Sequence, residues 1–156
     1  MATADASGSA LETLILDKFD ALVELVAGMD DAAANTVPPL PGGNSVVQLL
    51  THCCGMMRKW SSTVNLGVQV CRDRDGEFTA VSPVGEVLEL AAATRAAFIA
   101  DVAETDPERA PANVFTNQDA FWTATCYSVL LHIFEELCQH LGHAEITRDL
   151  VLAQER

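Results

Sequence analysis

Basic residues are scarce in this sequence. Nine Lys and Arg stand against 22 Asp and Glu among 156 residues, which gives a formal net charge of −13 at pH 7. No cluster of Lys and Arg offsets this acidic balance, so the chain as a whole repels a phosphate backbone or an anionic lipid surface. We therefore expect neither nucleic acid nor a membrane surface as a partner.

Long apolar runs and paired cysteine motifs are missing as well. No uninterrupted apolar run reaches the roughly 18 residues that a membrane span needs, and the first basic residue, Lys18, comes too late for the basic start of a secretory signal. The five cysteines include no C-x-x-C pair, which favours free thiols over a disulfide framework. These absences predict a cytoplasmic protein that is stabilised by packing.

Four segments of the sequence carry the apolar periodicity of amphipathic helices. Hydrophobic residues, which make up 49% of the chain, recur in these segments at spacings of three and four. Two of the segments open with a capping box, in which a Ser and a Glu or Gln three residues later bind the free amides of a helix start. The predicted helices begin at Ser9, Ser45, Ser82 and Thr116, and they end near Gly28, Asn65, Asp106 and Leu152.

The predicted fold is an all-α four-helix bundle, because four helices of this length can bury their apolar faces against one common axis. We assign residues 9–156 to this single domain and residues 1–8, rich in Ala, Ser and Gly, to a flexible N-terminus. Residues 68–81 lack periodicity and are predicted to form an ordered surface loop. In this loop, Arg72 and Arg74 either orient an anionic ligand or are simply solvated.

All four histidines fall on the second and fourth predicted helices. The fourth helix carries an ionisable stripe about 80° wide, which borders apolar residues and contains His132, Glu136, His140 and His143. One interpretation is a set of core histidines that only form hydrogen bonds. The other is a metal site, because ionisable groups facing a bundle interior are rare unless they are paired or bind a metal.

The metal interpretation makes the more specific prediction. Glu136 and His140 lie one helical turn apart, so both side chains can reach one ion. His52, in the middle of the second predicted helix, completes a set of two nitrogens and one oxygen, donors that zinc accepts while it keeps a position open. We predict that His52, Glu136 and His140 bind the metal, and that His132 and His143 orient the ligands or transfer protons.

The cysteines and tryptophans are given structural roles. Adjacent helical residues point about 100° apart, so the thiols of Cys53 and Cys54 are not aimed at the same spot as the His52 imidazole. Trp60 and Trp122 are predicted to line the core or a pocket wall. The cysteines predicted to be small buried residues are Cys53, Cys54, Cys126 and Cys138.

Three segments resemble the DinB-like superfamily of metalloenzymes, which includes the mycothiol-dependent maleylpyruvate isomerases and the mycothiol S-transferases of actinobacteria. The segments are residues 41–52, 72–78 and 131–149. The resemblance implies a four-helix bundle in which a His of the second helix and an H/E-x-x-x-H pair of the fourth hold a divalent metal. Residue by residue, these positions match His52, Glu136 and His140.

The same resemblance implies a chemistry. A divalent metal, most simply zinc with nickel, iron or manganese as alternatives, would activate the thiol of mycothiol as a thiolate. The implied function is a mycothiol S-transferase or a thiol-dependent isomerase that acts on a small electrophile. Two alternatives stay open: a metal-dependent hydrolase that uses metal-bound water, and a non-catalytic bundle that binds a metal or small ligand, as a monomer or as a homodimer.

Overall fold

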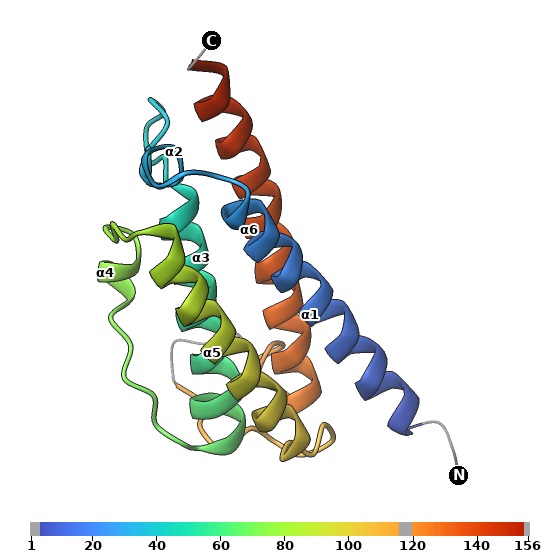
Figure 1. Ribbon diagram of the computed structural model, residues 1–156. Helices are drawn as coiled ribbons and strands as arrows, with labels where there is room; N and C mark the ends of the chain where they lie inside the picture. The colour runs from blue at the N-terminus through green and yellow to red at the C-terminus, as the bar shows by residue number, and fades with distance from the viewer. Residues whose placement is uncertain (1–3, 116–119, 155–156) are drawn as a thin grey trace.

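Helices account for all the regular secondary structure in residues 4–115 and 120–154, the part of the chain that the computed structural model describes. No strand occurs in these two ranges, so the predicted all-α four-helix bundle is confirmed (Figure 1). The four rods of the bundle are α1 (Ala4–Ala27), α3 (Val46–Arg58) continued by the π-helix η1 (Lys59–Leu66), α5 (Val84–Ala103) and α6 (Cys126–Gln154), and two short helices, α2 (Asp31–Asn35) and α4 (Arg74–Glu77), lie in the connections.

The rods run in an up, down, down, up order. α1 and α6 run in one direction, whereas α3 and α5 run in the opposite one (Figure 1). Because α3 and α5 are parallel neighbours, the connection between them must return along the length of the bundle. This connection, residues 67–83, is called the crossover below. It lays α4 against α3, and so brings a polar segment alongside that rod.

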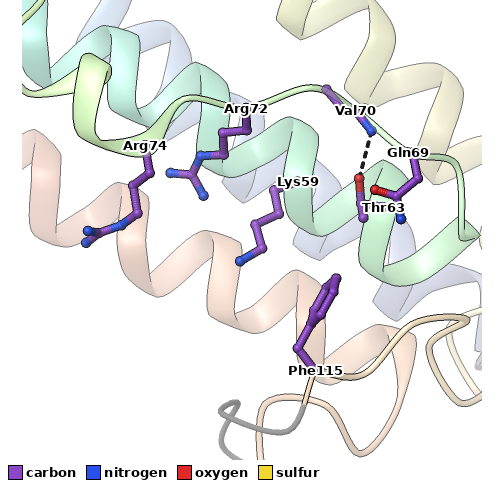
Figure 2. A pocket seen from close by; sticks show the side chains of 7 residues that line it. All are labelled: Lys59, Thr63, Gln69, Val70, Arg72, Arg74 and Phe115. Carbon is purple, nitrogen blue, oxygen red and sulfur yellow. Dashed lines mark hydrogen bonds between the residues drawn. The ribbon is translucent and has the colours of Figure 1, made fainter.

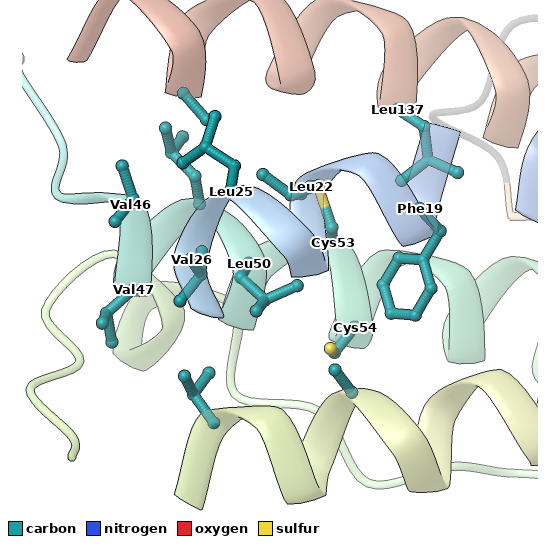
Figure 3. Close-up of a cluster of buried hydrophobic side chains, with 14 of the residues drawn as sticks. Phe19, Leu22, Leu25, Val26, Val46, Val47, Leu50, Cys53, Cys54 and Leu137 are labelled. Atoms are coloured by element: carbon teal, nitrogen blue, oxygen red, sulfur yellow. The ribbon is translucent and has the colours of Figure 1, made fainter. Parts of the chain in front are cut away.

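The core lies between the four rods and is built from the apolar faces that the periodicity predicts (Figure 3). Burying a large apolar side chain contributes about 1.5–3 kcal/mol relative to leaving it exposed. No helix in the described ranges is apolar enough over a sufficient length to cross a membrane. The largest fully buried side chains include Phe19, Leu22, Leu50, Phe98, Ile133 and Leu137.

The second rod begins at the predicted capping box and ends at Leu66, next to the predicted end at Asn65. Ser45 Oγ accepts a hydrogen bond from the Gln48 N–H (3.2 Å), and Gln48 Oε1 accepts one from the Ser45 N–H (3.0 Å), which is the predicted capping box. At the other end Gly67 has a φ of +75°, a left-handed conformation that glycine adopts readily, and its N–H donates to Ser62 O. The predicted helix is confirmed, and its last part is wound as the π-helix η1.

Two rods begin differently from the prediction. α1 begins at Ala4 rather than at Ser9, where the sequence predicts a capping box. At the start of α5, the predicted cap Ser82 does not bind the free amides. The Val84 N–H, the first amide of α5, instead donates to Asp31 Oδ1 at 2.7 Å. The cap of α5 therefore comes from α2, a helix distant in sequence.

The start of α6 also differs from the prediction. α6 begins at Cys126, so Phe121, which the periodicity placed in the helix, lies in a turn. The predicted cap at residues 116–119 lies outside the described residues. Thr125 has the position of a cap, since its Oγ1 accepts a hydrogen bond from the Ser128 N–H at 3.1 Å. The apolar residues before Cys126 misled the prediction because they extend the helical period into a turn.

Candidate metal centre

Three side chains from α3 and α6 converge. His52 extends from α3, and Glu136 and His140 extend from successive turns of α6. Glu136 Oε2 lies 3.8 Å from His52 Nε2 and 3.5 Å from His140 Nε2, and all three residues offer ligand atoms within 4.8 Å of one another. A second group of this kind, His132 with Glu135 and Glu136, includes the exposed Glu135. The structure thus brings together the three predicted ligands.

The spacing of these groups fits a shared ion better than direct hydrogen bonds. Both nitrogen–oxygen distances exceed the range of about 2.7–3.2 Å that is typical of a hydrogen bond. Ligand atoms that each lie about 2.1 Å from a tetrahedral zinc ion are about 3.4 Å apart. In addition, His140 Nδ1 is buried and has no hydrogen-bond partner among the described residues. His140 Nδ1 therefore lacks the outer hydrogen bond that His52 Nδ1 makes to Glu77.

Glu77, from the crossover, sets the orientation of the His52 ring. Glu77 Oε2 lies 2.9 Å from His52 Nδ1, and Arg72 donates to both Glu77 oxygens at 2.7 and 2.8 Å. When Nδ1–H is donated to Glu77, the lone pair of His52 Nε2 lies on the side of Glu136. A carboxylate bound in this way fixes the tautomer of a metal-binding imidazole and increases its basicity. The hydrogen bond between His52 and Glu77 is therefore of the kind that orients a metal-binding imidazole.

The electrostatics of the site favour a cation. Burial alone would raise the pKa of Glu77, but the hydrogen bonds from Arg72 and His52 outweigh it and lower that pKa. The imidazoles of His140 and His52 hold the pKa of Glu136 well below its usual range, although burial opposes them. Burial would lower the pKa of His52, whereas Glu136 and Glu77 raise it. Two ionised carboxylates thus face the His52 ring from opposite sides.

Gly55 makes room for the Glu77 carboxylate. A Cβ at position 55 would lie 1.9 Å from Glu77 Oε1 and 3.1 Å from Arg72 Nε. The space that a glycine leaves beside His52 is therefore filled by a side chain from the crossover, and Glu77 is only 6% exposed. Periodicity could not show this residue, which lies in an aperiodic segment. The available signal was a glycine in the middle of a helix, which marks a close approach.

The other two histidines of α6 lie outside the trio. The His132 ring packs against Trp60 and Trp122, with centroid distances of 4.6 and 5.0 Å. His132 Nδ1 has no hydrogen-bond partner in the described part of the chain, because the Glu135 carboxylate, 3.4 Å away, does not have the geometry of one. His132 lines the cavity at the trio, whereas His143 is not among the residues that line it. Proton transfer by His132 stays a prediction.

A cavity of about 160 Å³ opens beside the trio. A larger neighbouring cavity of about 320 Å³ extends to Thr63 and Phe115 (Figure 2). Trp60 lines the smaller cavity, as the sequence predicts for a pocket-wall residue. The smaller cavity is lined by His52, Met56, Lys59, Trp60, Arg72, Arg74, His132 and Glu136.

The cysteines next to His52 have the surroundings of buried structural residues and not those of nucleophiles. Cys53 and Cys54 are buried and point to different sides of α3, with Cys54 toward α5 (Figure 3). Burial raises the pKa of Cys53 well above its ordinary value and that of Cys54 to about 12. Cys126 is buried, as predicted, but Cys138 is exposed. The prediction for Cys138 was wrong because this residue follows the buried Leu137 by one position and so lies beside the apolar stripe.

Fold and site together define a four-helix bundle with a cluster of His and Glu side chains that could hold a metal ion. A crystal structure of a conserved protein from Enterococcus faecalis is similar to it, with a TM-score of 0.70 over 93% of this chain and 96% of that chain. The two sequences are 18% identical, so this likeness shows the shared fold. A comparison with curated proteins finds no match.

The family of the chain is shown by its sequence. The family model for mycothiol S-transferases (MST) matches residues 10–152, which is most of the chain. The chain therefore belongs to the mycothiol S-transferase family, within the DinB-like group that its motifs resemble.

Proposed function

We propose that the protein is a metal-dependent mycothiol S-transferase. The observation that supports this most is the convergence of His52, Glu136 and His140 beside a cavity, in a chain of the MST family. Two imidazole nitrogens and one carboxylate oxygen are donors that zinc accepts in catalytic sites. We therefore propose zinc as the metal. Nickel, iron and manganese accept the same donors and are to be separated from zinc by metal analysis of the purified protein.

The metal and the chain have different tasks in this proposal. A bound divalent metal lowers the pKa of a thiol next to it, so that a thiolate exists near neutral pH. His52, Glu136 and His140 hold the ion, and Glu77 keeps the His52 lone pair turned toward it. No thiol lines the cavity in the part of the chain that the structure describes, and in this proposal the sulfur comes from a small molecule. Such a thiol stays reduced in the cytoplasm, where we place the protein.

The reaction transfers the thiol sulfur to an electrophilic carbon. A carbon–sulfur bond forms, the bond from that carbon to its leaving group breaks, and the leaving group departs with the electron pair. The thiol proton passes to His132, which lines the cavity, or to water. In the isomerase version of this function, the sulfur adds to a carbon–carbon double bond and is expelled after rotation, so that no group is lost.

The proposal is tested with zinc-loaded protein, mycothiol and monochlorobimane, whose thioether product is fluorescent. We expect a rate above the uncatalysed one, which is lost on chelation and restored by zinc. Glu136→Ala removes a ligand and should lose this rate, whereas Glu145→Ala, an exposed position on the same helix, is the matched control. A protein that holds zinc and shows no rate above background contradicts the proposal.

Two further measurements separate the alternatives. Turnover of an ester or amide panel without any thiol would identify a metal-dependent hydrolase. Bound zinc that raises the melting temperature but has no exchangeable water ligand would identify a structural ion that holds α3 and α6 together. The family membership favours the thiol reaction over both.

A further inference from the structure

Three of the nine basic residues of this acidic protein gather beside the candidate metal centre. Lys59, Arg72 and Arg74 line both cavities, and Figure 2 shows their side chains on the same side of α3 and the crossover. Like charges that lie close together repel one another unless opposite charges compensate them. The partners of each cation therefore show how much positive charge the cavities hold.

The protein neutralises only one of these three cations. Arg72 donates to both oxygens of Glu77, so its charge serves the support of His52. Lys59 and Arg74 have no carboxylate within ion-pair distance among the described residues. The cavity wall thus carries two positive charges without a counter-charge from the described part of the chain.

Aromatic rings hold both of these free cations. Lys59 Nζ lies 5.4 Å from the centroid of the Trp60 ring and 5.5 Å from that of Phe115. The Arg74 guanidinium lies 5.5 Å from the centroid of the Phe78 ring. An aromatic face attracts a cation but leaves its charge in place. Burial, together with the nearby arginines, lowers the pKa of Lys59, as expected for an ammonium group that lacks an anion.

Basic residues elsewhere on the protein behave differently. Nearly all of those that the structure describes pair with an aspartate, and Arg109, which is exposed, is the exception. The paired residues are Lys18, Arg58, Arg95 and Arg148. Free cations on a partly enclosed wall are therefore a feature of the cavities and not of the protein surface in general.

Lys59 lies where the α-helix α3 changes into the π-helix η1. A π-helical segment widens the helix locally, and such segments are frequent at functional sites. Lys59 and Trp60 are the first two residues of η1, and both line the cavity at the trio. The irregular segment thus coincides with the part of the rod that faces the cavity.

We propose that the electrophile used by this protein carries an anionic group, which Lys59 and Arg74 bind at the cavity wall. This inference rests on the proposed function, in which the thiol lies at the metal centre and the electrophile fills the adjoining cavity. Lys59 and Glu136 line the same cavity of about 160 Å³, so one small molecule can reach both the cations and the sulfur. Cations held in place on aromatic rings lose little freedom when they bind a carboxylate.

A binding measurement tests the inference without the reaction. Acetophenone and 4-acetylbenzoate differ by one carboxylate and do not alkylate thiols. We expect zinc-loaded protein to bind 4-acetylbenzoate at least tenfold more tightly in calorimetry without mycothiol. Lys59→Gln and Arg74→Gln should each remove most of this difference, whereas Lys18→Gln, which removes the same charge outside the cavities, should keep it. A difference that survives in both cavity variants shows that zinc binds the carboxylate, and overturns the inference.

A kinetic measurement extends the test to the reaction. The probes are α-chloroacetophenone and its 4-carboxy derivative, which the mycothiol sulfur attacks at the chlorinated carbon. A carbon–sulfur bond forms, chloride leaves with the electron pair of the carbon–chlorine bond, and the thiol proton passes to the buffer. After correction for the uncatalysed rates, we expect kcat/KM to favour the anionic probe at least tenfold, and Lys59→Gln to reduce this preference toward one.

The outcomes separate this inference from the proposed function. Equal kcat/KM values for the two probes overturn the inference and leave thiol transfer standing. Binding that depends on the carboxylate, in a protein that transfers no thiol, supports the anionic pocket and contradicts the proposed function. If Lys59→Gln and Arg74→Gln raise the KM for mycothiol equally with both probes, the two cations bind the thiol substrate and the inference is wrong.

Discussion

The candidate metal centre draws on two regions of very different construction. The ligands His52, Glu136 and His140 stand on α3 and α6, whose positions are set by a core packed from four rods. Glu77 stands on the crossover, whose regular structure is the four-residue helix α4. The rods determine whether three donor atoms can meet at all. The crossover determines how one of them is oriented, so changes in the two regions should differ in size.

Removing a ligand from the rods should have the largest effect. His52→Ala, Glu136→Ala and His140→Ala each leave two protein donors, and we expect each to lose tight zinc binding. His132→Ala leaves the trio intact and should weaken zinc binding only modestly. Zinc affinity measured by competition with a chromogenic chelator checks this. If His132→Ala were as damaging as the other three substitutions, the ligand assignment would be wrong.

Removing the charge of Glu77, the residue that the crossover contributes, should have an intermediate effect on zinc affinity. Glu77→Gln keeps the shape of the side chain but removes the charge that fixes the His52 tautomer, and we expect about 10- to 100-fold weaker zinc binding. Glu86→Gln, at an exposed position of α5, removes the same charge far from the contact with His52 and is the control. An unchanged zinc affinity in Glu77→Gln would show that the crossover does not contribute to the metal centre.

Filling the space that Gly55 leaves for the Glu77 carboxylate should weaken the same contact between Glu77 and His52. Gly55→Ala places a methyl group where Glu77 Oε1 lies, so we expect zinc affinity to fall by about tenfold, within the range for the loss of an outer carboxylate. Gly85→Ala, where a Cβ meets nothing within 4 Å, is the matched control. Combined with Glu77→Gln, Gly55→Ala should add little further loss, because both changes remove one interaction. Fully additive losses would mean that Gly55 acts elsewhere.

A change at the end of a rod should have the smallest effect on zinc affinity. Asp31→Ala removes the acceptor for the first amide of α5, and we expect the free energy of unfolding to fall by about 1 kcal/mol in urea denaturation. Zinc affinity should stay the same, since the hydrogen bond between Val84 and Asp31 involves none of the residues of the candidate metal centre. A change in zinc affinity would show that the rod ends and the metal centre are coupled.

The sequence predicted well what depends on local periodicity. The 3.6-residue period placed Glu136 and His140 on one inward face, and the Ser45 capping box located the start of the second rod. Binding of a metal by these side chains stays a prediction. Cys138 shows the limit of the method, because a residue at the border of an apolar stripe can face either way.

Two further features that the sequence did not predict are contacts between distant parts of the chain. Glu77 meets His52 across 25 positions, and Asp31 binds the Val84 amide across 53. Neither contact has a period or a local spacing that sequence reasoning can count. Both depend on how the rods are arranged, which is settled only when the whole core packs.

The length of the crossover matters more than that of an ordinary surface loop, because of the path that the crossover takes. It leaves one end of the bundle and reaches the other, with Glu77 opposite Gly55 on the way. Each deleted residue would shorten its reach by up to about 3.3–3.6 Å, enough to pull the carboxylate out of register with its imidazole. An insertion or deletion here would therefore act as a metal-site mutation, although it would lie in a segment that usually tolerates changes of length.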